Sequence, residues 1–341
     1  VPPPSFRSTR VIRVPQECAN IKKAMVLAQI FSESTEYMEA GPIKIQMDKG
    51  VHEIVGDQWG RMNVTCSHIT FVGKDKDQTT IIGGFEVHKQ QHVAFEKLTV
   101  TNPKATGLFV WGSETNVDML MCRVEDCWGT GMDVDDGATV TATQCEFTGN
   151  FESGASFSDT NTKARLNDCT MHRNEEDGLV AYDRAVVNLH GTKTDIHSNK
   201  ENGIHVYQAA HVNIHLPSRH IASHGNVGED YWYQQAGGSI ANINADGSFT
   251  AMTPNFSSTK CINDVPVEVW RDKICKQFLN LADLSILRRC HSFFDKYWQN
   301  MMTQNVIRVP QGCPTVEKAM VLAVIFSERK EYTGADPLKI R

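Results

Sequence analysis

Glycine and apolar positions repeat with a regular period between residues 107 and 214. Five short segments share one pattern, in which a glycine precedes two apolar residues separated by one other residue. The segments open at Gly107, Gly131, Gly154, Gly178 and Gly203. Their spacings are 24, 23, 24 and 25 residues. A period of this length is typical of a solenoid, in which each repeat is one supersecondary unit.

Each period contains three short stretches in which apolar residues alternate with other residues. In the period that opens at Gly131, the apolar positions are Met132, Val134, Val140, Ala142, Cys145 and Phe147. Because successive side chains of a strand point to opposite faces, this alternation predicts three strands per turn with one face inward. One coil cannot bury its apolar face alone, whereas stacked coils can. The sequence therefore predicts an all-β dominated fold, a parallel β-helix over residues 11–250.

A polar row accompanies the apolar rows. Asn150, Asn174 and Asn199 occupy one register in successive turns, and Cys127 takes that place one coil earlier. Asparagine tolerates a left-handed backbone and can bond neighbouring peptide groups. We therefore expect an asparagine ladder in the turns.

The N-terminal region has a different pattern. Residues 1–10 are rich in proline and indicate a linker or a cut end. Apolar residues over 20–33 have helical spacing, with Asn20 available as the N-cap. An open first coil would invite pairing at its edge, so we expect this helix to cap it.

The period loosens after Ile214. Residues 218–233 are expected to form an irregular loop, and residues 244–247 a turn between two last strands. Residues 251–260 have the composition of a linker, and residues 261–303 that of several short amphipathic helices.

The chain then repeats its own beginning. Residues 306–311 are identical to residues 11–16, at an offset of 295, and residues 318–323 are identical to residues 23–28. We therefore predict that residues 304–341 are the truncated start of a second β-helix unit, which makes the sequence a fragment of a tandem array.

Composition and charge narrow the range of partners. The 341 residues carry a formal net charge of −6 and contain no run of lysine or arginine, which argues against nucleic-acid binding. The longest apolar stretches fall far short of the ~20 residues needed to span a bilayer, so no membrane partner is expected.

The ten cysteines lack the spacing of a zinc site. Cys122, Cys145 and Cys169 share one inward row, where a free cysteine behaves as a small hydrophobe. We expect reduced thiols and a cytoplasmic or nuclear protein. No metal and no cofactor are predicted.

The N-terminal cap, the glycine-led strands and the asparagine turns resemble right-handed β-helix proteins of the pectin-lyase-like superfamily. The resemblance covers about residues 11–250. It implies a right-handed coil, and it leaves the function open because this fold carries lyases, hydrolases and plain binding surfaces.

Residues 264–298 resemble an F-box. The residues that carry this resemblance are Val265, Pro266, Glu268, Val269, Trp270, Ile274, Asp283, Leu284, Leu287, Arg289, Cys290, Phe293 and Phe294. An F-box joined to a β-helix is similar to substrate adaptors of Skp–cullin–F-box ubiquitin ligases, including families of algal type. The resemblance implies that the helical segment binds a Skp-type adaptor and that the β-helix holds an unknown protein substrate. The adaptor-binding residues would be Val265, Pro266, Glu268, Trp270, Ile274, Leu284 and Leu287.

Alternation also predicts which residues face outward on the strands that follow the glycines. The candidate binding surface consists of Phe109, Trp111, Asp133, Asp135, Tyr182, His205 and Tyr207. Exposed aromatic rings on a rigid sheet provide a large contact area at little cost in conformational entropy. We therefore predict a non-catalytic protein-recognition module, the substrate-binding part of a ubiquitin-ligase adaptor.

Two alternatives remain open. Clustered carboxylates act as acid, base or calcium ligand in polysaccharide-cleaving β-helices, and Asp133, Asp135 and Asp136 are the catalytic candidates here. The neighbouring coil has Ser156 and Ser158 at the matching positions, so we expect no second carboxylate beside them and no enzyme. The turn Glu175–Asp177 indicates a solvated corner. A carbohydrate-active or carbohydrate-binding β-helix is the first alternative, and a purely structural solenoid is the second.

Overall fold

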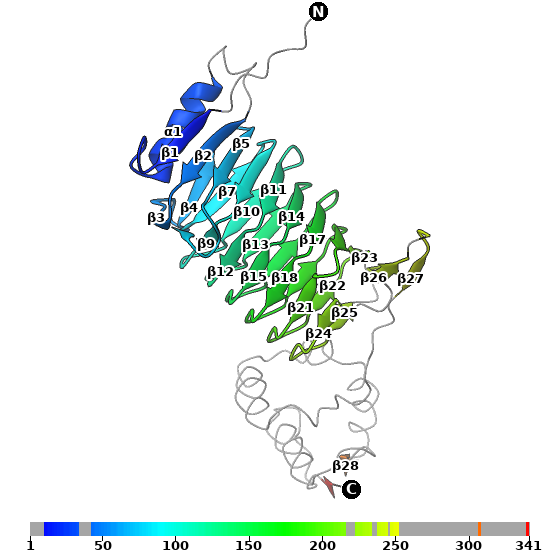
Figure 1. The fold of residues 1–341 in the computed structure, drawn as a ribbon. Helices are drawn as coiled ribbons and strands as arrows, with labels where there is room; N and C mark the ends of the chain where they lie inside the picture. Colours follow the sequence, from blue (N-terminus) through cyan, green and yellow to red (C-terminus); the bar gives the residue numbers. More distant parts are fainter. Residues whose placement is uncertain are drawn as a thin grey trace, which may run out of the picture. The chain divides into compact units, whose positions relative to one another are not determined.

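The computed structural model describes residues 10–33, 42–215, 222–233, 237–244, 246–251, 306–307 and 339–340. The chain divides into two compact units, Val1–Pro254 and Asn255–Arg341. In the first unit, successive coils stack into a parallel β-helix (Figure 1). The fold class predicted from the period is therefore confirmed.

Three sheets form the sides of the β-helix. Sheet 1 runs β1 (Val11–Val14), β2 (Ile43–Met47), β5 (Ile69–Val72), β8 (Val93–Glu96), β11 (Asn116–Leu120), β14 (Thr139–Thr143), β17 (Lys163–Asn167), β20 (Val186–His190), β23 (His211–His215), β26 (Ser239–Ile243) and β27 (Phe249–Ala251). Sheet 2 runs β4 (Arg61–Val64), β7 (Gly84–His88), β10 (Leu108–Trp111), β13 (Met132–Asp135), β16 (Ala155–Phe157), β19 (Leu179–Ala181), β22 (Ile204–Val206) and β25 (Tyr231–Tyr233). Sheet 3 runs β3 (Gly50–Glu53), β6 (Thr79–Ile82), β9 (Thr99–Thr101), β12 (Arg123–Glu125), β15 (Glu146–Thr148), β18 (Thr170–His172), β21 (Asp195–His197) and β24 (Ser223–His224).

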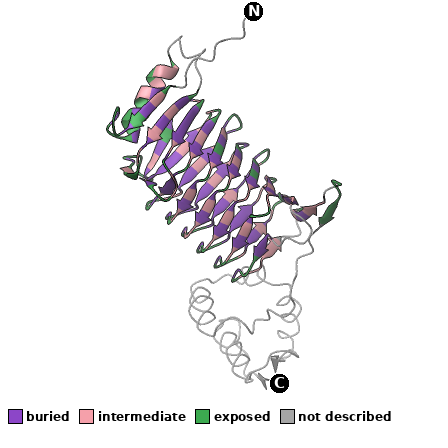
Figure 2. Cartoon of the chain, in the orientation of Figure 1, coloured by how far each residue is buried: buried purple, intermediate pink, exposed green. Residues whose placement is uncertain are grey.

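The register of the strands follows the sequence period. Met132 of β13 pairs with Leu108 of the preceding coil and with Ala155 of the next. Inward side chains consequently stack in rows, and buried and partly buried positions alternate along the strands (Figure 2). Near the N-terminal end, the rings of Phe71, Phe85 and Phe95 pack with centroids 4.8–5.1 Å apart.

The cysteine row lies inside the coil as expected. Cys122, Cys145 and Cys169 are at most 2% exposed. The cysteines of the described region are free and buried, and they are Cys18, Cys66, Cys122, Cys127, Cys145 and Cys169.

The predicted asparagine ladder is present between sheets 3 and 2. Asn174 Oδ1 accepts the backbone N–H and the side-chain amide of Asn150 at 3.1 and 3.0 Å. Asn199 receives the same pair of bonds from Asn174 at 3.2 and 2.9 Å, and Asn226 receives them from Asn199 at 3.0 and 2.8 Å. Cys127 takes the ladder position one coil before Asn150, and its Sγ accepts the N–H of Asn102 at 3.4 Å.

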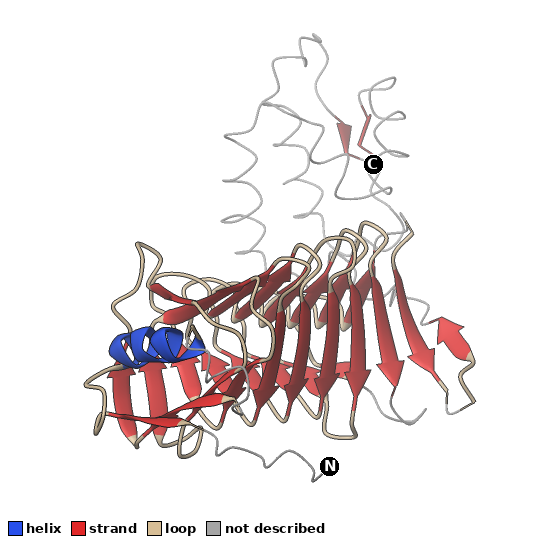
Figure 3. Cartoon of the chain, turned by 90° about the horizontal axis from the view of Figure 1, so that it is seen from above, coloured by secondary structure: helices blue, strands red, loops and turns tan. Residues whose placement is uncertain are grey.

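Helix α1 (Ile21–Ser32) closes the N-terminal end of the stack, where Figure 3 shows it beside the first strands. Asn20 is its N-cap and accepts the N–H of Lys23 at 2.9 Å. The helix packs on β1 and β2, and its buried residues are Ile21, Ala24, Met25 and Ala28.

The prediction of an irregular loop over residues 218–233 is wrong for part of that range. Ser223 and His224 form β24, which pairs with β21, and Tyr231–Tyr233 form β25, which pairs with β22. The spacing lengthens to 27 residues between the paired Ile204 and Tyr231. The additional residues fall between β23 and β24, so the strands keep their pairing while the sequence period is lost. The expected turn near residue 247 is present, and it joins β26 to the antiparallel β27.

In the second unit, the structure describes one parallel strand pair, β28 (Val306–Ile307) with β29 (Lys339–Ile340). Val306 pairs with Lys339, as Val11 pairs with Lys44 in the first coil.

The described residues do not include the F-box-like segment 261–303, with all of its predicted adaptor-binding residues, or residues 1–9. In the part of the chain that is described, no helix has the length and apolar character needed to cross a bilayer.

Candidate binding face on sheet 2

Two rows of side chains point outward from sheet 2. The first row consists of Asn63, Glu86, Phe109, Asp133, Ser156, Val180, His205 and Trp232, and neighbours along it are cross-strand partners. The second row consists of His88, Trp111, Asp135, Ser158, Tyr182 and Tyr207. We call these two rows the aromatic face. The structure places all seven residues of the predicted binding surface on it, and Asp136 in the exposed turn after β13.

Two pairs of stacked rings dominate the second row. Trp111 stacks on His88 with centroids 3.4 Å apart and planes 8° apart. Tyr182 stacks on Tyr207 with centroids 5.0 Å apart and planes 3° apart. The Trp111 indole N–H also donates to Glu86 at 3.1 Å. These contacts fix the orientation of the rings before any ligand binds.

Between the two ring stacks lie carboxylates whose environments differ. Burial raises the pKa of Asp133 to about 6, and the negative charges of Asp135 and Glu152 act in the same direction. Burial also opposes ionisation of Asp135, but hydrogen bonds from Asp159, the Ser158 hydroxyl and the Asp136 N–H outweigh it and lower its pKa. The Ser158 Oγ lies 2.8 Å from Asp135 Oδ1.

The sequence predicted that no further carboxylate lies beside Asp133 and Asp135. This prediction is correct for the neighbouring strand and wrong for the neighbouring turn. Ser156 is the cross-strand neighbour of Asp133, as predicted. However, Asp159 shares a hydrogen bond with Asp135, which raises the pKa of Asp159 to about 6. Alternation assigns faces only within strands, so it could not place Asp159 or Glu152, which lie in turns.

A histidine and a buried aspartate form a pair near the C-terminal end of the face. His205 Nδ1 lies 2.7 Å from Asp177 Oδ2. The other oxygen of Asp177 accepts the backbone N–H and the side-chain amide of Asn202, at 2.7 and 2.8 Å. Asp177 is only 4% exposed, so the prediction that Glu175–Asp177 is a solvated corner is wrong at Asp177. Trp232 meets His205 edge to face, with centroids 4.3 Å apart.

Another aromatic pair borders the face at the turns between sheets 3 and 2. Trp128 and Phe151 stack with centroids 4.6 Å apart, although they are 60% and 52% exposed. The two residues follow Cys127 and Asn150 in the ladder register. The register of the asparagines was therefore the signal that could have found them.

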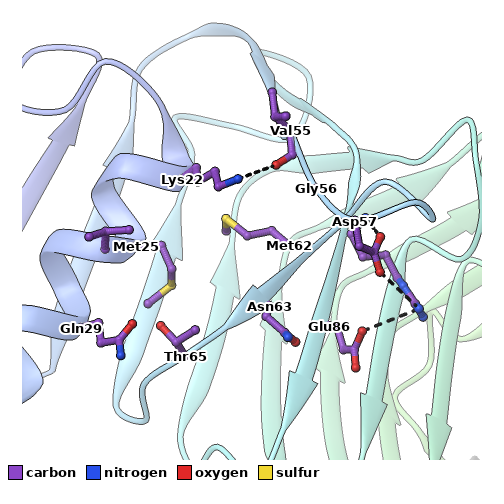
Figure 4. A pocket seen from close by; sticks show the side chains of 12 residues that line it. Lys22, Met25, Gln29, Val55, Gly56, Asp57, Met62, Asn63, Thr65 and Glu86 are labelled. Atoms are coloured by element: carbon purple, nitrogen blue, oxygen red, sulfur yellow. Dashed lines mark hydrogen bonds and ion pairs between the residues drawn. The ribbon is translucent and has the colours of Figure 1, made fainter.

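A pocket opens at the N-terminal end of the face, between α1 and β4 (Figure 4). Its volume is about 360 Å³. Arg61 lies at its edge, with its guanidinium carbon 5.1 Å from the centroid of Phe109. Sequence reasoning missed Arg61 because the matching positions in later coils are glycines, beginning with Gly84.

Within the described residues, no group of three or more histidine, cysteine, aspartate or glutamate side chains is arranged to hold a metal ion. The carboxylates of the face offer hydrogen bonds and negative charge to a ligand, and Asp133, with a pKa of about 6, is mostly ionised at pH 7.

A family model agrees with the architecture. Residues 59–216 match a family model described as "Right handed beta helix region". The coil is a right-handed β-helix. This confirms the handedness that the resemblance implied. A crystal structure of the pectate lyase Pel9A aligns with a TM-score of 0.37 and 12% sequence identity, over 70% of this chain and 77% of that chain. No curated protein sequence matched this chain.

Proposed function

We propose that this right-handed β-helix is a non-catalytic recognition module whose aromatic face binds an extended segment of another protein. The observation that carries the proposal is the pair of ring stacks, His88 with Trp111 and Tyr182 with Tyr207, held on either side of Asp135 and Ser158. Rings that are already ordered lose little conformational entropy on binding, which favours them as anchors for a ligand.

The spacing of the stacks suits an extended chain. Trp111 and Tyr182 are separated by three strand spacings, or ~14 Å along the coil axis. An extended polypeptide rises about 3.3 Å per residue, so roughly four residues span this distance. Side chains at both ends of such a segment can rest on a ring, while Asp135 and Ser158 offer hydrogen bonds to the residues between them.

Charge favours a basic segment. The two rows contain Glu86, Asp133 and Asp135 and neither a lysine nor an arginine. Asp159 and Glu152 add further carboxylates at the adjoining turns. The Arg61 guanidinium, 5.1 Å from the Phe109 ring, already lies beside two acids. A cationic peptide is therefore attracted, and an anionic polymer is repelled.

The experiment is a fluorescence-anisotropy comparison with extended basic peptides from a library. The double variant Trp111→Ala with Tyr207→Ala is expected to bind the tightest-binding peptide with at least ~10-fold lower affinity, because each substitution removes an aromatic anchor. Phe249→Ala is the matched control, since Phe249 is 73% exposed and lies on β27, outside the two rows. Unchanged affinity in a folded double variant would refute the assignment of this face.

We further propose that residues 261–303 bind a Skp-type adaptor, so that the protein acts inside the cell as a substrate adaptor of a ubiquitin ligase. Support for this comes from the F-box resemblance of residues 264–298. The test is co-purification of the full chain with a Skp-type protein, compared with a chain that lacks residues 261–303. Equal recovery from both chains, or no recovery from either, would exclude the adaptor role.

A second candidate, carbohydrate hydrolysis or lysis, is favoured by the opposite pKa shifts of Asp133 and Asp135. Below about pH 6, Asp133 is protonated while Asp135 is ionised, and glycosidic bond cleavage uses such a pair of carboxyl groups. Polysaccharide incubated with the parent protein should then release reducing or unsaturated sugar ends, and Asp133→Asn with Asp135→Asn should abolish the release. If the parent releases none, this candidate is eliminated. If neither peptide nor sugar binds, a purely structural solenoid remains.

A further inference from the structure

We infer that the pocket between α1 and β4 binds one apolar side chain together with a neutral hydrogen-bond acceptor, the combination that an amino-acid residue within a polypeptide provides. The inference deepens the proposed recognition function, because the pocket would anchor one residue of the segment that lies on the aromatic face. It can be tested without knowing that segment.

The pocket has an apolar base and a polar rim. Met25 of α1 and Met62 of β4 line it while being only 4% and 6% exposed. The exposed side chains of Val26 and Val55 extend this apolar wall toward solvent. Methionine adapts its shape to irregular apolar groups. A volume of about 360 Å³ accommodates a residue-sized group.

Arg61 supplies the observation that points to a ligand. Its Nε is buried and has no hydrogen-bond partner among the described residues. Its Nη2 lies 3.7 Å from Asp57 and 3.6 Å from Glu86, which is longer than a hydrogen bond. A buried donor without an acceptor is unfavourable. Protein atoms enclose Nε, so a ligand acceptor would bind at Nη2, which makes only these two long contacts.

The charges around Arg61 decide what kind of acceptor fits. The carboxylates of Asp57 and Glu86 both lie within 4 Å of Arg61 Nη2, at 3.7 and 3.6 Å. A ligand carboxylate would have to approach these two carboxylates, whereas a neutral carbonyl oxygen would not. The pocket therefore favours an amide carbonyl over an anion.

The pocket is continuous with the aromatic face through Arg61. Because Gly84 occupies the paired position in the next coil and has no side chain, the Arg61 side chain can extend across β7 toward Phe109. A segment lying along the first row can then place one side chain against Met25 and Met62 with its carbonyl oxygen at Arg61.

The probe is N-acetyl-leucinamide, which carries one apolar side chain and two amide carbonyls. We expect it to shift the methyl NMR signals of Met25 and Met62 in the full chain in a saturable way. N-acetyl-leucine, which has a carboxylate instead of the second amide, is expected to bind more weakly. Absence of saturable shifts at both methionines, or equal affinity for the two probes, would overturn the inference.

Two variants test the site independently. Arg61→Gln is expected to lower the affinity for the probe about tenfold, because a hydrogen bond from a charged donor is lost. Asn63→Trp, at an exposed strand position on the rim, is expected to block the pocket even if the Arg61 variant does not fold. Arg165→Gln, on the outer surface of sheet 1, is the control and should bind the probe as the parent does. Full affinity in both pocket variants would refute the site.

Failure of this inference can be told apart from failure of the proposed function. Tyr182→Ala with Tyr207→Ala removes a ring stack that has no contact with the pocket lining, so this variant should bind the probe normally. If the chain binds basic peptides in a Trp111-dependent way but does not bind the probe, only the pocket assignment is wrong. If the probe binds and no peptide does, the pocket stands and the recognition face does not.

Discussion

At the scale of single residues, Asn174 shows how one side chain connects successive coils. Its amide is fully buried, accepts two bonds from Asn150, and donates to Asn199 and to the carbonyl of Phe147. Replacing it leaves several buried polar groups without partners, each of which costs ~1–3 kcal/mol. Asn174→Ala is therefore expected to lower the free energy of unfolding by about 4 kcal/mol, measured by urea denaturation.

Asn63→Ala is the control for this prediction, because Asn63 is exposed on β4. It should change the free energy of unfolding by no more than ~0.5 kcal/mol. A loss below ~1 kcal/mol for Asn174→Ala would mean that water replaces the ladder, and that the asparagines are not essential to the fold.

The opposite pKa shifts of Asp133 and Asp135 predict opposite effects on stability. Asp133 has a folded-state pKa of about 6, above the ~3.9 of an unfolded aspartate. Its ionisation therefore destabilises the fold increasingly between about pH 4 and pH 6, and fully at pH 7. Asp133→Asn should raise the free energy of unfolding at pH 7 by roughly 2 kcal/mol, and this gain should vanish near pH 3.5.

Asp135→Asn provides the contrast. The folded-state pKa of Asp135 is lowered, so its ionised form stabilises the fold above the unfolded-state pKa, and that contribution disappears as the pH falls. The Asp135 variant should consequently be less stable than the parent at pH 7. Thermal unfolding of both variants between pH 3.5 and pH 7 checks the two signs, and equal behaviour would contradict the assignment.

At the scale of elements, α1 packs on the first coil, and we expect it to keep the strand edge there from pairing with other chains. Ala24 is fully buried on the face of the helix that packs against the coil. A carboxylate there would be buried without a partner, so Ala24→Asp should detach the helix and expose the strand edge beneath it. We expect the variant to self-associate, as measured by light scattering during gel filtration.

Val26→Asp is the matched change on the same helix, since Val26 is 55% exposed. It should remain monodisperse to the same extent as the parent. If Ala24→Asp also leaves the association state unchanged, the helix is not what keeps the first coil from pairing.

At the scale of the whole molecule, the β-helix should be stable without the second unit. Contacts in a solenoid run only between neighbouring coils, so its stability does not depend on a remote unit. Residues 1–254 form one compact unit of the chain. A chain of residues 1–254 is expected to unfold within a few degrees of the β-helix transition of the full chain, measured by circular dichroism. A large fall in that temperature would show that the second unit supports the β-helix.

The strand register shows how far the local pattern extends. Met132, Leu108 and Ala155 could be aligned from their spacing alone, because side chains must alternate and each coil must cover its neighbour's apolar row. The same reasoning failed at Tyr231, where the spacing changed without changing the pairing. Backbone pairing between coils is a tertiary interaction, and it tolerates turn lengths that obscure a sequence period.

The sequence by itself determined the coil, its inward rows, the asparagine ladder, the capping helix and the residues that alternate onto the outer surface of sheet 2. These follow from spacing because a repeating backbone turns spacing into position. Only the tertiary structure decided the chemistry of that surface. Asp159 reaches Asp135 from a turn, Asp177 is buried beside His205, and Arg61 extends over Gly84 toward Phe109. Each of these contacts joins residues from different coils through turns or long side chains, whose directions no periodic pattern specifies.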